Sequence, residues 1–360
     1  LYWLWDLGLK VGQSSRSIDE MVRMAKSDLS IRTALLEGRY IWGDTGVYEE
    51  AKHRFFQDVV AGTDSTFVAE KLAERDLRHK KMGDSRYVVE PNVKEGKGGM
   101  RDLQTLYWIG KYIHQVASAE DLVEVGLLTA DEFKRFRKAA NFLWAVRCHM
   151  HDMTGRAEDR LTFDLQPEVA RRMHFADRPG KSSVERFMQY YFLNAKVVGN
   201  LTGVFLAHLD ETHNAGVRRF LPSLTRKPKK LKGFVLDRGR LALPDESFFE
   251  EDPVRLVEIF WLADKHGLEI HPLAMRAARR DAKLIDNKVR TDARANKLFL
   301  DVLCSPRDPE LVLRWMNEAA IFGRFIPDFG RVVAQMQFDM YHHYTVDEHT
   351  IRAIGLLARI

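Results

Sequence analysis

Histidines and carboxylates are concentrated near the end of the chain, in the stretch YHHYTVDEHTIR at residues 341–352. It holds three histidines, one aspartate and one glutamate, side chains that bind metal ions or orient the groups that do. A hydrolytic metal site needs about three protein ligands and one position open for water. VDEHTIR supplies one or two ligands at most, so the others would have to come from elsewhere.

A structural interpretation of this stretch is equally open. Thr345 could cap a helix, with Asp347 and Glu348 in solvent and interacting favourably with the helix dipole. An earlier histidine–aspartate pair, His151 and Asp152, falls within an apparent helix in the middle of the chain. We expect that pair to be structural rather than the missing part of a metal site.

A second candidate is the glycine-rich stretch EPNVKEGKGGMRDLQTLYW at residues 90–108. Glycines let the backbone approach a ligand closely, and a helix N-terminus presents free N–H groups to an anion. Lys94, Lys97 and Arg101 could pair with phosphate oxygens. GKGG does not match the P-loop pattern. A turn before a helix, with Asp102 balancing the helix dipole, would explain the same residues without a ligand.

A third candidate combines VGQSSR with ALLEGRYIWGD near the start of the chain. Ser14, Ser15 and Arg16 could hold phosphates. Glu37 could bind Mg²⁺, which prefers oxygen ligands from a few carboxylates and from substrate phosphates. A single carboxylate on a helix face is usually only solvated, so this signal is weak by itself.

The composition excludes several other classes of protein. The two cysteines, Cys148 and Cys304, are far apart and form no CxxC motif, which argues against a disulfide scaffold or a thiolate zinc site. No apolar run reaches the roughly 18–20 residues of a membrane span, and no signal peptide is visible. We therefore expect a cytoplasmic protein with no membrane partner.

The charge balance does not indicate nucleic acid binding. Lys and Arg number 56 against 51 Asp and Glu, a mild excess that is compatible with an anionic small substrate. The basic tract TRKPKKLKG at residues 225–233 has no interleaved aromatic side chains for base stacking. We predict that it belongs to a solvated linker over residues 212–233, and we expect no nucleic acid partner.

Apolar periodicity predicts a mostly α-helical protein with a small α/β part at the front. Alternation over residues 7–15 predicts a strand. Helical spacing follows over residues 17–39, with Ser17 as the N-cap and Glu20 three positions later. Broad apolar stripes predict helices over most of residues 100–210, and FVLDRGRLALP at residues 234–244 predicts a hairpin.

Taken together and in order, these stretches resemble the family of bifunctional PII uridylyltransferase/uridylyl-removing enzymes. The resemblance is carried by LWDLGLKVG…SR, LLEGRYIWGD, EPNVKEGKGGMRDLQTLYW, RLTFDLQ, VERFMQYYF and MQFDMYHHYTVDEHTIR. It implies transfer of UMP from UTP to a tyrosine of the PII signalling protein, and hydrolytic removal of that UMP, in control of nitrogen assimilation. The chain opens on LYWLWDLGLKVG without an initiator methionine, and we expect an internal fragment that is inactive alone.

The resemblance also implies the domain organisation. The fold would be mainly α, with the C-terminal part of a polymerase-β-like α/β nucleotidyltransferase domain in front and the first helix of an HD-type all-α domain at the end. The implied segments are a nucleotidyltransferase part (1–75), a helical uridylyltransferase domain (76–211), a linker (212–233), a hairpin with helices (234–335) and the truncated start of an HD-type hydrolase domain (336–360).

Site residues follow from the same resemblance. Glu37 would be the third carboxylate of the transferase, and His349 the first metal-binding histidine of the HD-type site. The family often has histidine where this chain has Gln13, so Gln13 receives no acid–base role. Mg²⁺ would serve the transferase, and Mg²⁺ or Mn²⁺ the hydrolase. The implied nucleotide-binding residues are Ser14, Arg16, Lys94, Gly98, Gly99, Arg101 and Asp102.

Two alternatives remain at this stage. The helical body could be a non-catalytic module that docks PII, with the glycine-rich stretch as a structural turn. The related glutamine synthetase adenylyltransferase shares the transferase and helical domains, but it has no HD domain, so YHHYTVDEHTIR argues against it.

Overall fold

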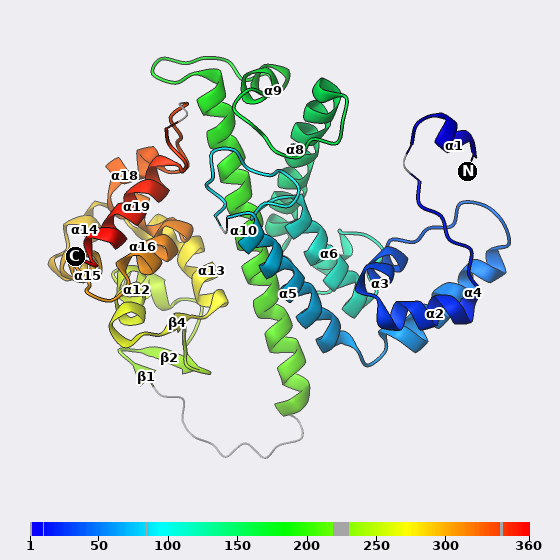
Figure 1. Ribbon diagram of the computed structural model, residues 1–360. Coiled ribbons are helices and arrows are strands. Elements are labelled where there is room, and N and C mark those ends of the chain that lie inside the picture. Colours follow the sequence, from blue (N-terminus) through cyan, green and yellow to red (C-terminus); the bar gives the residue numbers. More distant parts are fainter. Residues whose placement is uncertain (1, 10, 84, 219–229, 339–340) are drawn as a thin grey trace. The chain divides into compact units, whose positions relative to one another are not determined.

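The computed structural model describes residues 2–9, 11–83, 85–218, 230–338 and 341–360, and most of them are helical (Figure 1). The predicted mainly α fold is thereby confirmed, whereas the assignment of segments to named domains remains a prediction. The chain divides into two compact units. The first comprises Leu1–Glu74 and Tyr107–Asp121, and the second comprises Arg75–Leu106 and Leu122–Ile360.

The first unit is built from short helices and from parts of two longer ones. They are α1 (Tyr2–Asp6), α2 (Ile18–Ser27), α3 (Leu29–Leu36), α4 (Thr45–Phe55), the π-helical turn η1 (Phe56–Val60), the beginning of α5 (Asp64–Lys81) and the end of α6 (Met100–His114). Its core includes Phe67 of α5 stacked on Tyr112 of α6, with ring centroids 3.8 Å apart. The Tyr112 hydroxyl lies 2.7 Å from Oγ1 of Thr63, so this buried ring also satisfies its polar end.

The strand predicted over residues 7–15 is wrong, because none of the described residues there belongs to a strand. Leu7 and Leu9 are 73% and 52% exposed, so the alternating apolar residues have no core against which to pack. A strand must also pair its backbone with a neighbour, and the described residues of this unit offer no partner strand.

The helix predicted over residues 17–39 is interrupted. The predicted N-cap is confirmed, since Oγ of Ser17 accepts a hydrogen bond from the N–H of Glu20 at 3.2 Å. Asp28 then leaves helical geometry, with φ −128° and ψ 116°. Its carboxylate accepts from the N–H groups of Ser30 (2.7 Å) and Ile31 (3.0 Å) and so caps a second helix, α3. Local capping therefore divides a continuous apolar pattern.

The helical body of the second unit contains the end of α5, the beginning of α6, and four further helices. These are α7 (Asp121–Glu124), α8 (Ala130–Thr154), α9 (Gln166–Arg172) and α10 (Ser183–Arg218), the long green helix of Figure 1. Thr129 and Glu132 form a capping box at the start of α8. Helices α8 and α10 pack through aromatic rings, as where Phe142 meets Tyr190 edge to face at 4.8 Å.

The linker predicted over residues 212–233 overlaps the end of helix α10. Helix α10 continues to Arg218, so residues 212–218 are helical rather than linker. Residues 219–229 lie outside the described residues. The next element, β1, begins at Lys230.

A small sheet follows, with strand order β1 (Lys230–Leu231), β2 (Phe234–Asp237), β3 (Arg240–Ala242) and β4 (Glu269–Ile270). The predicted hairpin is confirmed as the antiparallel pair β2–β3, whereas β4 pairs with β3 in parallel. Arg238 and Gly239 form its turn with φ of 50° and 80°. Positive φ at both central residues is the geometry that suits the right-handed twist of a hairpin.

The remaining helices pack beside this sheet around a second apolar core. They are α11 (Phe248–Glu251), α12 (Arg255–His266), α13 (Pro272–Asp281), the 3₁₀ helix η2 (Ala282–Leu284), α14 (Asn287–Thr291), α15 (Ala293–Leu303), α16 (Pro309–Glu318), α17 (Ile321–Phe325), α18 (Pro327–Val332) and α19 (Val346–Leu357). Phe249 and Phe260 are fully buried in that core. Phe322 stacks on Phe329 with ring centroids 3.7 Å apart.

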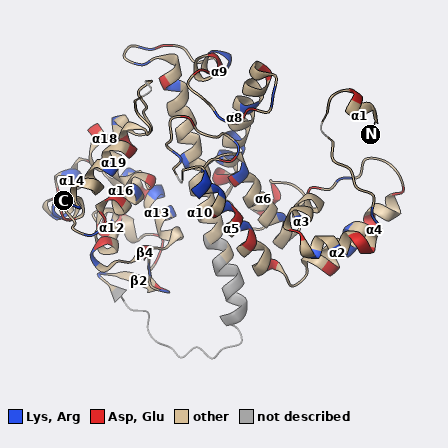
Figure 2. Cartoon of the chain, in the orientation of Figure 1, with Lys and Arg blue, Asp and Glu red and all other residues tan. Residues whose placement is uncertain are grey.

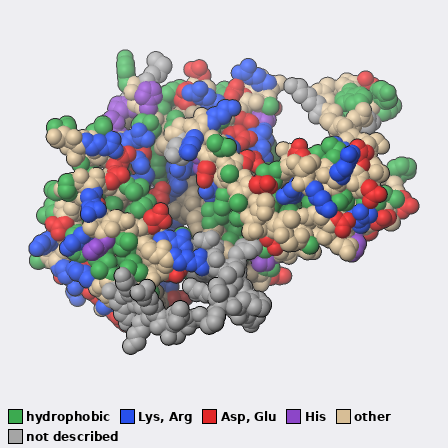
Figure 3. Space-filling model, turned by 60° about the horizontal axis from the view of Figure 1, so that its bottom comes forward, with side chains coloured by type: hydrophobic (Ala, Val, Ile, Leu, Met, Phe, Trp, Pro, Cys, Tyr) green, Lys and Arg blue, Asp and Glu red, His purple; other side chains and the backbone are tan. Residues whose placement is uncertain are grey.

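Charges of both signs are interspersed over the described surface. On the face shown in Figure 3, Lys and Arg side chains lie next to Asp and Glu side chains. The last turn of α5 carries four basic residues, Arg78, His79, Lys80 and Lys81, of which Lys80 and Lys81 are exposed (Figure 2). Among the described residues, no helix combines the length and the apolar character that crossing a membrane requires.

Candidate functional site

The glycine-rich turn of the second unit is shaped by its own backbone. Oδ1 of Asn92 accepts from the N–H groups of Lys94 (3.1 Å) and Glu95 (2.6 Å), which starts the turn. Gly98 has φ +79°, and a Cβ there would lie 2.5 Å from the carbonyl oxygen of Ala195 on α10. A Cβ on Gly99 would lie 2.7 Å from the carbonyl oxygen of Val93. Close backbone packing therefore explains both glycines without a ligand.

Asp102 is an internal partner of this turn rather than an exposed helix-start residue. Its side chain is only 2% exposed, and its Oδ2 accepts from the N–H of Gly98 at 2.8 Å. Its Oδ1 lies 2.9 Å from Nε2 of His79 and also accepts from Arg78. Burial alone would raise the pKa of Asp102, but the hydrogen bond from His79 and the nearby positive charges outweigh it and lower that pKa. The carboxylate is therefore held charged inside the fold.

Lys94 and Arg101 lie beside one carboxylate, that of Glu95. Oε1 of Glu95 is 3.2 Å from Nη2 of Arg101 and 3.7 Å from Nζ of Lys94. Its Oε2 is 3.8 Å from Nε of Arg78. Lys94 is also 3.9 Å from Asp159 of the loop after α8. The side chains of Lys94 and Arg101 are 31% and 24% exposed, so an incoming anion could compete with Glu95 for both.

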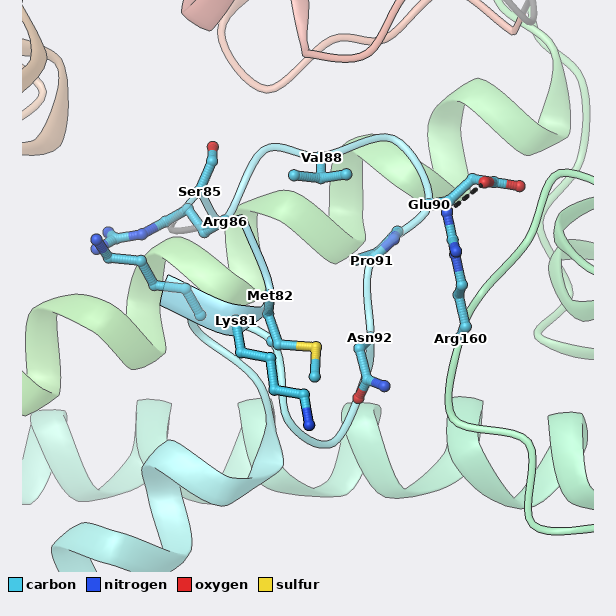
Figure 4. A pocket seen from close by; sticks show the side chains of 11 residues that line it. Lys81, Met82, Ser85, Arg86, Val88, Glu90, Pro91, Asn92 and Arg160 are labelled. Atoms are coloured by element: carbon cyan, nitrogen blue, oxygen red, sulfur yellow. Dashed lines mark hydrogen bonds and ion pairs between the residues drawn. The ribbon is translucent and has the colours of Figure 1, made fainter. Parts of the chain in front are cut away.

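A pocket of about 240 Å³ lies beside the first half of this stretch (Figure 4). The Glu90–Arg160 ion pair, with 3.0 Å between its atoms, lies at one edge, and Arg86 lies at the opposite edge. The lining residues are Lys81, Met82, Ser85, Arg86, Val88, Glu90, Pro91, Asn92, Gly96, Lys97 and Arg160. Four of these are cationic and one is acidic, but Arg160 is paired with Glu90 and Arg86 lies 3.3 Å from Glu318.

Sequence reasoning missed Lys81 and Arg160 as lining residues. Lys81 ends α5, and Arg160 follows α8 by six residues, so no local motif joins them. The basic run RHKK at the end of α5 was the one available signal for Lys81. Only the fold brings these side chains to the same pocket.

The candidate residues of the first unit do not converge on one another. Ser14 and Arg16 are exposed in a segment with no helix or strand. Glu37 is the C-cap of α3, and its Oε1 accepts a hydrogen bond from Nε1 of Trp108 on α6 at 2.9 Å. That indole orients the carboxylate. In the described part of the chain, however, no three His, Cys, Asp or Glu side chains form a group that could hold a metal ion.

The C-terminal stretch is not the solvated helix start of the structural interpretation. Thr345 precedes α19, but its hydroxyl makes no capping hydrogen bond. Thr345, Asp347 and Glu348 are buried, at 0%, 0% and 1% exposure. His349 is exposed on α19, and its ring centroid lies 6.1 Å from that of His342. His349 is therefore available to a site, although the described residues do not complete a metal site around it.

The earlier pair His151 and Asp152 lies on α8, as predicted. Nε2 of His151 lies 3.1 Å from Oδ1 of Asp159, and Asp152 pairs with Arg172. Both side chains thus have partners within the helical body. The described residues offer no complete set of ligands for the transferase and hydrolase metal ions that the resemblance implies.

Two family models match the chain. The model described as GlnD PII-uridylyltransferase matches residues 66–206, and the model described as uridylyltransferase GlnD third domain matches residues 234–325. A bifunctional uridylyltransferase/uridylyl-removing enzyme of Novosphingobium aromaticivorans is 70% identical over 360 residues, the whole of this chain. The chain belongs to the bifunctional uridylyltransferase/uridylyl-removing enzyme family. This confirms the resemblance drawn from the motifs.

A second family member, from Erythrobacter litoralis, is 63% identical over 362 aligned residues. The chain spans 40% and 39% of the lengths of these two curated relatives. No solved structure is significantly similar to it. The match to the first family model runs from α5 into α10 and includes the glycine-rich turn together with His79 and Asp102. The second begins at β2 and ends with α17, so α19 and His349 lie beyond both models.

Proposed function

We propose that this chain is part of a bifunctional enzyme that transfers UMP from UTP to a tyrosine of a PII regulatory protein and hydrolyses uridylylated PII. The observation that carries the proposal is the 70% identity to a bifunctional relative along the entire chain. We propose a cytoplasmic enzyme in which Mg²⁺ assists transfer and Mg²⁺ or Mn²⁺ assists hydrolysis. Such ions would align the phosphate and activate water when bound.

Within this function, the glycine-rich stretch divides into two sets of residues. Lys94 and Arg101 would leave the carboxylate of Glu95 and bind the phosphates of UTP, which carry more negative charge. The partial exposure of both side chains supports this proposal. Gly98, Gly99 and Asp102 would act by holding the turn that presents those two cations. Their contacts with α10 and α5 support this division.

In the first unit, Ser14 and Arg16 would meet the nucleotide, and Glu37 would supply one carboxylate oriented by Trp108. His349 would serve hydrolysis from the exposed side of α19. Since the described residues hold no complete group of metal ligands, we propose that the chain by itself turns over neither reaction.

The test is the mass of PII after incubation with UTP and Mg²⁺. The 360-residue chain and the full-length protein that contains it would be compared in parallel. We expect only the full-length protein to add one UMP and, after UTP is removed, to release it. Addition of UMP by the chain alone would place the complete transferase within residues 1–360. Failure of the full-length protein to add UMP would overturn the proposed function.

A docking role for the helical body is the second candidate, and the internal contacts of Asp102 and of the two glycines favour it. Lys94→Ala and Arg101→Ala in the full-length protein separate the two roles. Loss of UMP transfer with unchanged PII binding would support nucleotide contacts. Loss of PII binding would instead assign this surface to docking.

A further inference from the structure

Residues 343–346, which lead into α19, are attached to two other segments through their backbone. The N–H of Thr345 donates to the carbonyl of Tyr87 (3.2 Å), and the N–H of Val89 donates to the carbonyl of His343 (3.2 Å). The N–H of Val346 donates to the carbonyl of Gln335 at 2.8 Å. The chain therefore enters α19 along a fixed path, and side chains determine how the helix is then oriented.

Asp347 extends this attachment into the core. Its carboxylate is fully buried, and its Oδ2 accepts from Nδ2 of Asn317, at the end of α16, at 2.8 Å. Its other oxygen, Oδ1, has no hydrogen-bond partner among the described residues. A buried carboxylate is costly to desolvate, so the single bond from Asn317 contributes strongly to keeping Asp347 in this position.

Asn317 is itself held by Lys196 of α10. The Lys196 ammonium donates to the main-chain carbonyl of Asn317 and lies 3.4 Å from the side-chain oxygen Oδ1 of the same residue. Lys196 and Asn317 are 8% and 2% exposed. The amide of Asn317 thus accepts from a cation on one side and donates to an anion on the other. These two contacts fix the orientation of the Asn317 amide. They connect α10, α16 and α19 through a buried series of polar side chains, Lys196, Asn317 and Asp347.

A second contact from α16 reaches the next residue of α19. Nη2 of Arg314 lies 2.7 Å from Oε1 of Glu348, which is also 3.2 Å from Nε of Arg352. Arg314 and Asn317 are three residues apart on α16, so they lie on the same helical face. Two neighbouring acidic residues of α19 are therefore received by one face of α16.

Helical geometry connects these contacts to His349. Each residue turns an α-helix by about 100°, so residues two apart point in widely different directions. With Asp347 directed into the core, His349 is directed outward, as its exposure shows. We infer that Asn317, supported by Lys196, is a positioning residue that sets the orientation of His349 through Asp347. This inference rests on the proposed function only in assigning His349 to hydrolysis.

The test uses the full-length protein carrying Asn317→Ala. Release of UMP from uridylylated PII and transfer of UMP to PII are measured on the same preparations, together with hydrogen exchange of residues 345–352. We expect hydrolysis to fall by about 10-fold or more relative to transfer, the range seen when groups that orient functional side chains are removed. Exchange in 345–352 should become faster. Asn194→Ala is the matched control, because Asn194 is 7% exposed and, among the described residues, its side chain hydrogen-bonds to its own helix alone, at the carbonyl of Tyr190.

A double variant tests the order of the series. Asn317→Asp with Asp347→Asn keeps the net charge, lets the carboxylate at 317 accept from Lys196, and lets the new amide at 347 donate to it. We expect this pair to recover most of the hydrolysis that Asn317→Asp alone loses by placing two carboxylates together.

The outcomes separate the two claims. If hydrolysis and transfer fall in parallel, or if exchange in residues 345–352 is unchanged in Asn317→Ala, the positioning role is overturned. If the unaltered full-length protein releases no UMP, the proposed hydrolysis fails, and the exchange measurement still decides whether Asn317 holds α19.

Discussion

The N–H of Gly98 donates a 2.8 Å hydrogen bond to the buried carboxylate of Asp102. The same carboxylate receives His79 from the last turn of α5, and Gly98 lies against the backbone of α10 at Ala195. The glycine-rich turn is therefore held against α5 through Asp102 and packs against α10 through Gly98. We therefore expect substitutions of Gly98 or Asp102 to lower the stability of the protein, whether or not the turn binds a ligand.

Asp102→Ala should lower the free energy of unfolding by about 3–5 kcal/mol, because it removes a buried carboxylate that pairs with Arg78 and hydrogen-bonds to His79 and to the N–H of Gly98. Urea denaturation of the chain measures this change. Asp131→Ala, on an exposed residue of α8, is the control and should stay within about 0.5 kcal/mol of the unaltered protein. Equal stability of the two variants would show that Asp102 is not a structural partner.

Gly98→Ala should destabilise the protein more than Gly126→Ala. Both glycines have positive φ, +79° and +76°, so each variant carries a backbone cost of about 1–2 kcal/mol. Only at Gly98 would the new Cβ also meet backbone, at 2.5 Å from Ala195, whereas Gly126 has nothing within 4 Å. Thermal unfolding of both variants isolates the packing contribution. Matching losses would mean that α10 moves away from the turn without cost.

The stability contributed by Lys196 should increase with pH. Burial, followed by the positive charge of Arg279, lowers its pKa from 10.5 to about 8, against the opposing effects of Asp347 and Glu318. Between these two values the unfolded chain binds more protons than the folded one, so the free energy of unfolding rises with pH. Below about pH 8 the full cost of burying the charge is present.

The measurement compares the unaltered protein with Lys196→Met in urea at pH 7.5 and at pH 9.5. The difference between them should shift by about 2 kcal/mol in favour of the unaltered protein at the higher pH. Comparison of the two proteins cancels the titration of other groups. Parallel pH profiles would show that Lys196 keeps an ordinary pKa.

Glu37→Gln should separate orientation from charge in the first unit. A glutamine oxygen can still accept from Nε1 of Trp108, so the unfolding free energy should change by less than about 0.5 kcal/mol. In the full-length protein, UMP transfer should fall by about tenfold or more, because the carboxylate charge that a metal ion requires is gone. Glu50→Gln, exposed on α4, is the control. Unchanged transfer would remove Glu37 from the site.

The sequence by itself determined the family, the mainly α fold and several local features. Ser17 caps α2, and residues 234–244 contain a hairpin, as predicted. Such features are readable because they depend on residues only two to four positions apart. The family motifs are likewise continuous stretches that need no knowledge of the fold.

Only the tertiary structure decided which polar residues are internal. Asp102 meets His79 across 23 positions, Asp347 meets Asn317 across 30, and Asn317 meets Lys196 across 121. The described residues of the stretch 7–15 have no such long-range partner, which explains why they form no strand. Burial and charge pairing depend on neighbours that are distant in sequence, so local pattern could not distinguish a solvated Asp347 from one that holds α19 in place.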